Sequence, residues 1–194
     1  MLPAIAYCSC CGTRVELRVP PGDHLERAVC PRCGEIHYRN PKVIVGCIPE
    51  WHDRILMCRR SIEPRLGRWT FPAGFLELGE STAQGAAREA REEARADVEV
   101  GALFAVIGVP YVSQIYMVHR GRLRAESFGP TLESSEVRLM RQEEIPWDEI
   151  AFPTVWHSLR HFFADRAAGA FGIHVLDIAR REGPLPPETA GAPV

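Results

Sequence analysis

Residues 70 to 96 constrain the possible fold of this 194-residue chain more than any other stretch. A glycine-containing turn leads to Ser81, and Gln84 follows three residues later, so the pair forms a capping box at a helix start. No proline interrupts the chain from there to Ala94, and Gly85 is the only weak helix former. The stretch therefore predicts a turn followed by one helix.

The predicted helix has two faces of opposite chemistry. At about 100° per residue, Glu89, Glu92 and Glu93 share one narrow face. Gly85 lies on the same face, so nothing bulky is expected to crowd the carboxylates from the turn below. The second face carries only methyl groups, from Ala83, Ala86, Ala87, Ala90 and Ala94. A face this flat predicts close packing against a β-sheet.

The acidic face has two interpretations. In the plainer one, it is a solvated surface whose carboxylates pair with Arg88, Arg91 and Arg95. In the other, the carboxylates gather beside an open backbone carbonyl in the Gly74 turn and hold Mg²⁺ or Mn²⁺, because hard cations prefer oxygen ligands. Like charges at these spacings repel by roughly 0.2–0.5 kcal/mol per pair, which a bound cation would offset.

The charged residues of this stretch also have a characteristic spacing. Gly74, Glu80 and the run from Arg88 to Glu93 follow the pattern G-x5-E-x7-R-E-U-x-E-E-x-G-U. The sequence therefore resembles the Nudix box, and every charged position of that motif is present. Arg95 stands where the motif has glycine, and Ala96 is a small choice for its last apolar residue. The glycine of the motif would normally end the helix in a left-handed conformation, so its absence leaves the last residue of the helix undetermined. One expectation is that the helix extends beyond Ala94 toward Asp97.

The Nudix resemblance implies an α/β fold, an α/β/α sandwich with a mixed sheet. The pattern of apolar runs agrees with this fold. It predicts strands at residues 42–48, 54–58, 69–71, 99–109 and 114–119, a turn at 49–53, and a closing amphipathic helix at 153–165. The domain is expected to span residues 39–166, with a C-terminal extension at 167–194 whose Pro-, Gly- and Ala-rich tail is predicted to be disordered from about residue 183.

The resemblance also implies roles for the residues of the box. Glu89, Glu92 and Glu93, with the Ala73 carbonyl, are expected to bind catalytic Mg²⁺ or Mn²⁺. Glu80 and Arg88 are expected to fix the helix against the Gly74 loop, as a supporting pair around a metal site. A water with a lowered pKa would then be the nucleophile.

The general base is a separate question. Some Nudix enzymes use a box glutamate and others a glutamate on a later loop. Residues 132–138 supply Glu133 and Glu136 on such a loop. Glu136 is the preferred base here, and the plain alternative is an exposed acidic loop without a catalytic role.

Residues 1–38 form a separate predicted module. Cys8, Cys11, Cys30 and Cys33 lie in two C-x-x-C-G knuckles, eighteen residues apart, a spacing typical of a structural Zn²⁺ site. A segment this short cannot bury a sufficient core, so a metal ion would stabilise it, and two disulfides are the alternative. Cys10 is expected to stay free. Two more cysteines, Cys47 and Cys58, lie in apolar runs and are predicted to be buried.

Charge and composition limit the partners. A formal net charge of −2 and the balanced charges of the cysteine module give no electrostatic footprint for nucleic acid or membrane. No signal peptide or membrane-spanning run is apparent, so a cytoplasmic location is expected. The resemblance adds the expectation of a homodimer acting on a small-molecule nucleotide.

The substrate is less sharply constrained than the reaction. A zinc ribbon before a Nudix domain suggests NADH pyrophosphatase, but the S-Q-P-W-P-F-P motif of those enzymes is absent after Ser113-Gln114. The stretches 40–51, 62–69 and 143–153 resemble instead the subgroup of plant chloroplast ADP-ribose and FAD pyrophosphatases and their bacterial relatives. Hydrolysis of ADP-ribose, FAD or a similar compound to AMP and a second phosphate is therefore expected. The alternatives are NADH, a damaged nucleoside triphosphate, or a non-enzymatic ADP-ribose sensor.

Substrate contacts are predicted from two residue types. Arg60 and Arg68 belong to an arginine-rich segment before the box, and guanidinium groups bind diphosphate in a bidentate manner, with plain solvated charge as the alternative. Aromatic side chains are candidates to stack on adenine: Trp51, Trp69, Phe75, Tyr111 and Tyr116. Trp51 follows a turn signal and is the preferred one.

Overall fold

The computed structural model describes residues 4–179, which fall into two compact units divided between Pro41 and Lys42. The tail beyond residue 183, predicted to be disordered, lies outside the described residues. Each unit has its own sheet. Within the described residues, no helix is both long and apolar enough to cross a membrane.

The first unit is a small three-stranded antiparallel sheet. Its strands are β1 (Glu16–Arg18), β2 (Arg27–Val29) and β3 (Ile36–His37), in the order β1-β2-β3. Very few apolar side chains are buried in it, while several large ones are exposed: Tyr7, Leu17, Val19, Leu25 and Tyr38. A unit with so small a core needs another source of stability.

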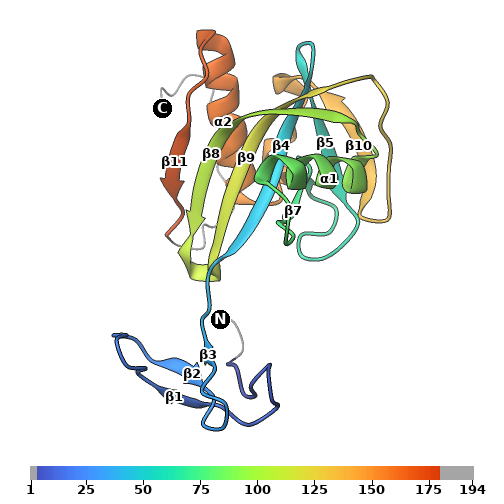
Figure 1. Ribbon diagram of the computed structural model, residues 1–194. Helices are drawn as coiled ribbons and strands as arrows, with labels where there is room; N and C mark the ends of the chain where they lie inside the picture. The colour runs from blue at the N-terminus through green and yellow to red at the C-terminus, as the bar shows by residue number, and fades with distance from the viewer. Residues whose placement is uncertain (1–3, 180–194) are drawn as a thin grey trace. The chain divides into compact units, whose positions relative to one another are not determined.

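The second unit is built on one eight-stranded sheet (Figure 1). Its main path runs β10-β5-β4-β9-β8-β11, with β6 pairing with β5 and β7 pairing with β4. The strands are β4 (Lys42–Trp51), β5 (Arg54–Arg60), β6 (Trp69–Thr70), β7 (Ala73–Phe75), β8 (Val98–Val109), β9 (Gln114–Leu123), β10 (Ser134–Met140) and β11 (His174–Asp177). The pairs β4–β9 and β8–β11 are parallel and the others antiparallel, so the predicted mixed sheet is confirmed.

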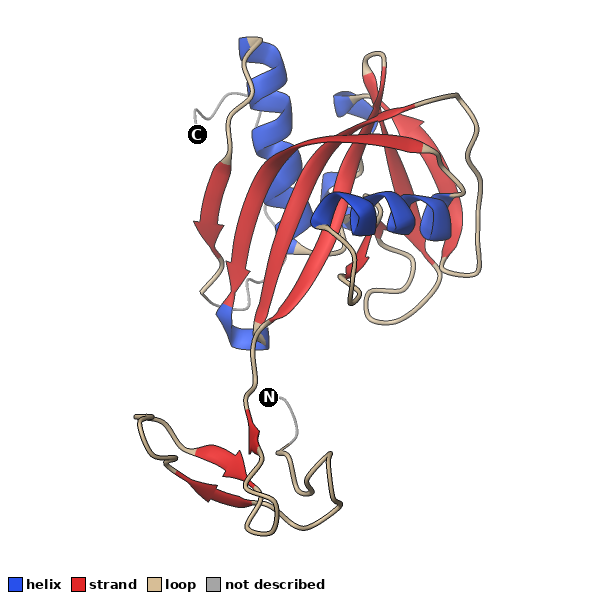
Figure 2. Cartoon of the chain, viewed as in Figure 1, coloured by secondary structure: helices blue, strands red, loops and turns tan. Residues whose placement is uncertain are grey.

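Two helices cover opposite faces of this sheet (Figure 2). The box helix, α1 (Thr82–Ala94), packs its alanine face on a buried cluster that includes Cys47 and Cys58. The second helix, α2 (Pro153–Ala168), packs on the other face through a larger aromatic and aliphatic cluster. The predicted sandwich, the two buried cysteines and the contact through Ala86, Ala90 and Ala94 are therefore confirmed, while Ala83 and Ala87 are only half-buried. Three 3₁₀ helices connect the strands: η1 (Pro110–Val112), η2 (Gln142–Glu144) and η3 (Trp147–Glu149).

The end of α1 corrects one expectation. The helix stops at Ala94 and does not extend toward Asp97, because Arg95 itself adopts the left-handed conformation, with φ 52° and ψ 25°. The amide of Ala96 then donates to the carbonyl of Ala90 at 3.1 Å, which closes the helix end as a glycine would. Ala96 is fully buried, so a small residue fits where the motif has a larger apolar one.

Strands β4 and β5 separate soon after their hairpin. They pair only at Glu50–Ile55 and Trp51–Arg54, so Trp51 belongs to the strand and not to the predicted turn. Further along, β7 takes the place beside β4, and a Cβ on Gly46 would lie 2.5 Å from Ala73 Cβ. Beyond the hairpin, β4 therefore pairs with β7 and β5 pairs with β6.

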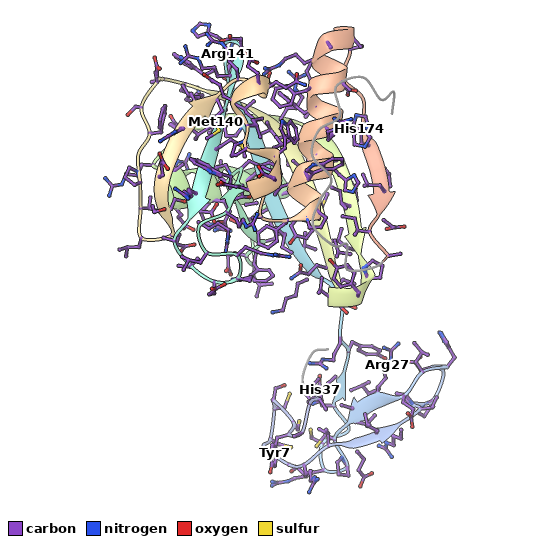
Figure 3. The ribbon with its side chains drawn as sticks, turned by 180° about the vertical axis from the view of Figure 1, so that it is seen from behind. Tyr7, Arg27, His37, Met140, Arg141 and His174 are labelled. Atoms are coloured by element: carbon purple, nitrogen blue, oxygen red, sulfur yellow. The ribbon has the colours of Figure 1, made fainter. Side chains whose placement is uncertain are left out.

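The C-terminal extension adds a strand that the sequence analysis did not predict. Strand β11 pairs in parallel with β8, from His174 beside Ala105 to Asp177 beside Gly108. His174 accepts or donates a hydrogen bond at 2.8 Å with Asp165 of α2, and its ring stacks on His161. The view from behind shows His174 on β11 beside this helix (Figure 3). Residues 174–177 of the extension therefore form an edge strand of the sheet.

Candidate active site

The carboxylates of α1 differ strongly in exposure. Glu89 and Glu93 are only 7% and 5% exposed, whereas the side chain of Glu92 is 55% exposed. Glu93 Oε2 accepts a hydrogen bond of 3.0 Å from the amide of Ala73 in β7. Gly74 allows this close contact between strand and helix, because a Cβ there would lie 2.4 Å from Glu89 Oε1.

Arg88 ties the helix to the turn before it. Its guanidinium donates to both oxygens of Glu80, at 2.7 and 3.1 Å, and to the carbonyl of Phe75 at 2.9 Å. It also reaches Glu89 at 2.6 Å and Glu92 at 3.0 Å. Such bidentate, charge-assisted contacts fix the angle between turn and helix.

Gly85 has a different role from the one expected. It is buried against the sheet, and a Cβ there would lie 2.7 Å from both Glu80 Oε1 and Val45 Cγ2. The glycine therefore lets α1 approach β4 and leaves room for Glu80, rather than clearing space around the metal-binding carboxylates.

Burial raises the proton affinity of the two inner carboxylates. It raises the pKa of Glu93 to about 8, against a smaller opposing effect from the Ala73 amide. Burial also raises the pKa of Glu89, with Arg88 lowering it in part. Two desolvated carboxylates beside an exposed third form a set of hard oxygen donors, so these residues fit a divalent cation of the Mg²⁺ type.

These carboxylates line a cavity of about 640 Å³. Its other walls come from distant parts of the chain: the segment after β5, the ends of β8 and β9, residue 133 and the start of α2. Arg60 lines the cavity as well, donates from Nε to the Pro64 carbonyl at 2.8 Å, and lies with its guanidinium 5.2 Å from the Phe152 ring centroid. It is close enough to Glu93 to lower the pKa of that carboxyl.

Three residues expected at the site lie elsewhere. Trp51 lines a separate cavity of about 830 Å³, at the other end of β4. Arg68 donates to the Asp148 carbonyl and does not line the carboxylate cavity. Glu136 lies in β10 rather than on a loop, so its side chain meets Arg59, at 3.6 Å, and Arg138. None of these three side chains lines the carboxylate cavity.

Glu133 is the later acidic residue that does line the cavity. It precedes β10 and is exposed, and its charge raises the pKa of both Glu89 and Glu93. Of the predicted stacking residues, Trp69 is buried in the core, while Phe75, Tyr111 and Tyr116 line the cavity. The sequence analysis did not single out Gln114, Phe152 or Thr154, which also line it. The aromatic residue before the Pro153 helix start was the available signal for Phe152.

The cysteine module also forms a compact donor cluster. The Sγ atoms of Cys8, Cys11, Cys30 and Cys33 all lie within 4.8 Å of one another, and these cysteines are not in disulfides. Cys10 is exposed and outside the cluster; its amide donates to Cys8 Sγ at 3.4 Å. Four converging thiols suit a structural metal ion.

Comparison with known proteins finds a matching family model for each of the two units. Residues 6–39 match a zinc-ribbon model described as Nudix N-terminal, and residues 40–166 match the NUDIX domain. The chain therefore belongs to the Nudix hydrolase family. A crystal structure of a NUDIX hydrolase from Nitrosomonas europaea is 49% identical, with a TM-score of 0.85, over 90% of this chain and all of that chain.

Two curated relatives have named activities. The NAD-capped RNA hydrolase NudC of Stutzerimonas stutzeri is 36% identical over 110 residues, which is 54% of this chain and 36% of that protein. The ADP-ribose pyrophosphatase of Methanocaldococcus jannaschii is 34% identical over 73 residues, which is 38% of this chain and 43% of that protein. In both cases, the matched region spans less than half of the relative.

Proposed function

We propose that the chain is a divalent-metal-dependent pyrophosphohydrolase that splits ADP-ribose, FAD or a related ADP-linked nucleotide into AMP and a second phosphate. The observation that carries this proposal is the pair of buried carboxylates, Glu89 and Glu93, facing a cavity that also holds Arg60. Buried negative charge needs a cation, and a diphosphate bound beside a cation and an arginine is the substrate such a site fits.

Glu89 and Glu93 would hold Mg²⁺ or Mn²⁺, with Glu92 and the Ala73 carbonyl beside them. When bound, the ion neutralises phosphate charge and lowers the pKa of water. Arg88 and Glu80 would keep the carboxylates in place through the hydrogen bonds described above. The four cysteines of the ribbon would hold a structural Zn²⁺.

The remaining residues orient the substrate and accept a proton. Arg60 would bind the diphosphate, in preference to Arg68, because it lines the carboxylate cavity. Glu133, which lines the same cavity, would take the proton of the attacking water, in preference to Glu136. Water adds to one phosphorus atom as its bond to the bridging oxygen breaks, so each product keeps one phosphate. The name of the Methanocaldococcus relative supports an ADP-ribose-like substrate.

An NAD-linked substrate is the second candidate. The relatives from Stutzerimonas, Pseudomonas, Photobacterium and Vibrio are named NAD-capped RNA hydrolases, which makes contact with nucleic acid a possibility that the balanced charge of the ribbon did not predict. NAD also contains an ADP moiety, so the same carboxylates and Arg60 would act on its diphosphate.

Product analysis tests the proposal. The protein is incubated with Mg²⁺ or Mn²⁺ and, separately, with ADP-ribose, FAD, NADH, NAD-capped RNA and a nucleoside triphosphate. AMP from ADP-ribose or FAD is the expected result. NMNH plus AMP, or RNA with a 5′-monophosphate, would favour the second candidate, and inorganic pyrophosphate would indicate a triphosphatase.

Variants of the box distinguish catalysis from binding. Glu93→Gln removes a charged ligand and is expected to lower kcat/KM about 10³-fold, since losing a metal ligand costs several kcal/mol of transition-state stabilisation. Glu126→Gln, at an exposed position outside the cavity, is the matched control and should keep wild-type activity. Tight ADP-ribose binding without turnover of any substrate would contradict an enzymatic role and indicate a sensor.

A further inference from the structure

Part of the lining of the carboxylate cavity differs in chemistry from the carboxylate wall, and we call this part the arm. Most of it comes from the end of β8, the start of β9 and the first turn of α2. Its walls are mainly apolar, from Ile44, Val109, Val112, Val155 and Ile178. Three polar side chains interrupt them: Gln114 and Tyr116 from β9, and Thr154 from α2. An apolar slot with a few convergent polar groups is the usual design of a site for a flat, polar-edged ligand.

Thr154 contributes a buried hydroxyl to the arm, near enough to the Tyr116 phenol to lower the pKa of that group. Its side chain is 3% exposed, and its hydroxyl makes no hydrogen bond of ordinary geometry with the described residues. An unpaired buried hydroxyl is costly and uncommon in folded proteins, so a ligand in the arm is the natural partner.

The neighbouring polar groups are already ordered. The Tyr116 hydroxyl donates to Gln114 Oε1 at 3.2 Å, which holds the carboxamide in place. The carbonyl oxygen keeps a second lone pair, and the amide nitrogen keeps its donors for a ligand. Burial raises the pKa of Tyr116, with the nearby Thr154 hydroxyl opposing it, so the phenol remains a neutral donor.

Arg60 connects this arm to the carboxylates. Arg60, Glu93 and Tyr116 line the same cavity, and the charge of Arg60 lowers the pKa of both other groups. A nucleotide whose diphosphate binds Arg60 at the carboxylates would therefore direct its other end into the arm. Tyr111 is 39% exposed, lines the cavity as well, and is near enough to Tyr116 to raise the pKa of that phenol.

We propose that this arm is the nucleobase subsite, in which Tyr111 stacks on the base, Thr154 and Gln114 bind its edge, and Gln114 selects adenine. The proposal rests on the nucleotide substrate proposed above. A carboxamide presents a donor next to an acceptor, which complements N7 and the 6-amino group of adenine. At the same edge, guanine presents two acceptors. Aromatic stacking adds affinity for either base.

Binding of reaction fragments tests the subsite without requiring turnover. Isothermal titration in Mg²⁺ compares AMP, GMP and ribose 5-phosphate, the last of which lacks a base. The wild-type protein is expected to bind AMP at least tenfold more tightly than the other two. Gln114→Ala should lower AMP affinity at least tenfold and leave ribose 5-phosphate within twofold. Gln142→Ala, exposed and outside the cavity, is the matched control.

Thr154→Val provides a second variant in case Gln114→Ala disturbs the fold. It removes the unpaired hydroxyl at nearly constant volume, so the melting temperature should hold or rise while AMP affinity falls. Equal affinity of wild-type protein and both variants for AMP would overturn the subsite. So would equal loss of AMP and ribose 5-phosphate binding, or AMP binding no tighter than ribose 5-phosphate in the wild type.

The subsite and the proposed function can fail separately. AMP binding that depends on Gln114, in a protein that hydrolyses nothing, supports the subsite and overturns the enzymatic function. The opposite result is also possible to distinguish. If Gln114→Ala hydrolyses ADP-ribose and keeps the wild-type preference for ADP-ribose over GDP-linked sugars, the function is supported and the subsite is overturned.

Discussion

The two donor clusters of this protein are supported in opposite ways. The four cysteines lie in a unit with almost no buried apolar side chains, so a metal ion bound by the thiols would take the place of a core in that unit. The box carboxylates lie on a helix packed on a large sheet, and Glu89 and Glu93 are buried there despite their charge. In the ribbon, a bound metal would stabilise the fold, whereas in the Nudix domain the fold would prepare the metal site. The contrast predicts different responses to metal removal.

Metal removal should have the largest effect on the ribbon. A structural Zn²⁺ contributes roughly 10–16 kcal/mol of apparent binding free energy, so a strong chelator should unfold residues 4–41. The Nudix domain should keep its own cooperative transition, because its core includes no thiol of the cluster. Amide hydrogen exchange with and without chelator measures both units. If the ribbon kept its protection from hydrogen exchange in the presence of chelator, or the Nudix domain lost its own, the proposed contrast would be contradicted.

Metal removal should also make the Nudix domain sensitive to pH. The pKa of Glu93 is raised to about 8 from an ordinary value near 4.5, so the folded state binds this proton more tightly than the unfolded state. The favourable contribution is complete below about pH 4.5 and is lost as pH rises toward 8. At about 1.4 kcal/mol per pKa unit, the loss amounts to a few kcal/mol.

Denaturant titrations of the chelated protein at several pH values check this dependence. Glu93→Gln should make the free energy of unfolding nearly independent of pH in this range, because a neutral amide has no proton to lose. Glu126→Gln should keep the wild-type dependence on pH. In saturating Mg²⁺, the free energy of unfolding should instead rise with pH, since the ion replaces the proton on the carboxylate. An unchanged slope in Glu93→Gln would assign the pH dependence to other groups.

Two glycines separate effects on the site from effects on the fold. The atoms nearest to a Cβ on Gly74 are those of the Glu89 carboxylate, so Gly74→Ala should displace that carboxylate, lower kcat about 100-fold and change stability by less than about 1 kcal/mol. A Cβ on Gly46 meets the Ala73 Cβ and the Pro72 backbone, so Gly46→Ala should cost about 1–3 kcal/mol of stability. Kinetics and melting curves on both variants test the pair. If both variants lost the same activity for each kcal/mol of lost stability, this separation of site from fold would be contradicted.

Local pattern was sufficient to predict one wall of the site. The capping box, the acidic face and the alanine face depend on residues within a few turns of each other, and the structure shows all three. The other walls depend on how strands separate and which side chains face inward. Glu133 and Glu136 are three residues apart, yet only Glu133 lines the cavity, because β10 begins between them. Period and propensity alone do not determine such a strand start.

The same reason explains why Trp51 and Arg68 do not line the carboxylate cavity and why Gln114 and Thr154 were not predicted to line it. Trp51 and Ile44 belong to one strand, but β4 is long enough that they line different cavities. Gln114 and Thr154 are forty residues apart and line the same cavity because β9 begins near the first turn of α2. No local signal in the sequence brings them together. The functional side chains that were predictable are those fixed by helix geometry.

The smallest expected effect concerns the end of α1. Arg95 adopts a left-handed conformation that costs a non-glycine residue about 1 kcal/mol, although the hydrogen bonds of the helix end form as they would with glycine. Arg95→Gly should therefore raise the free energy of unfolding by about 0.5 kcal/mol, because relief of strain slightly exceeds the added entropy of the unfolded chain. Arg95 is exposed and outside the cavity, so kcat should not change. Arg95→Ala, which keeps the strain, is the matched control for denaturant titration. A Gly variant no more stable than the Ala variant would show that the left-handed position is unstrained here.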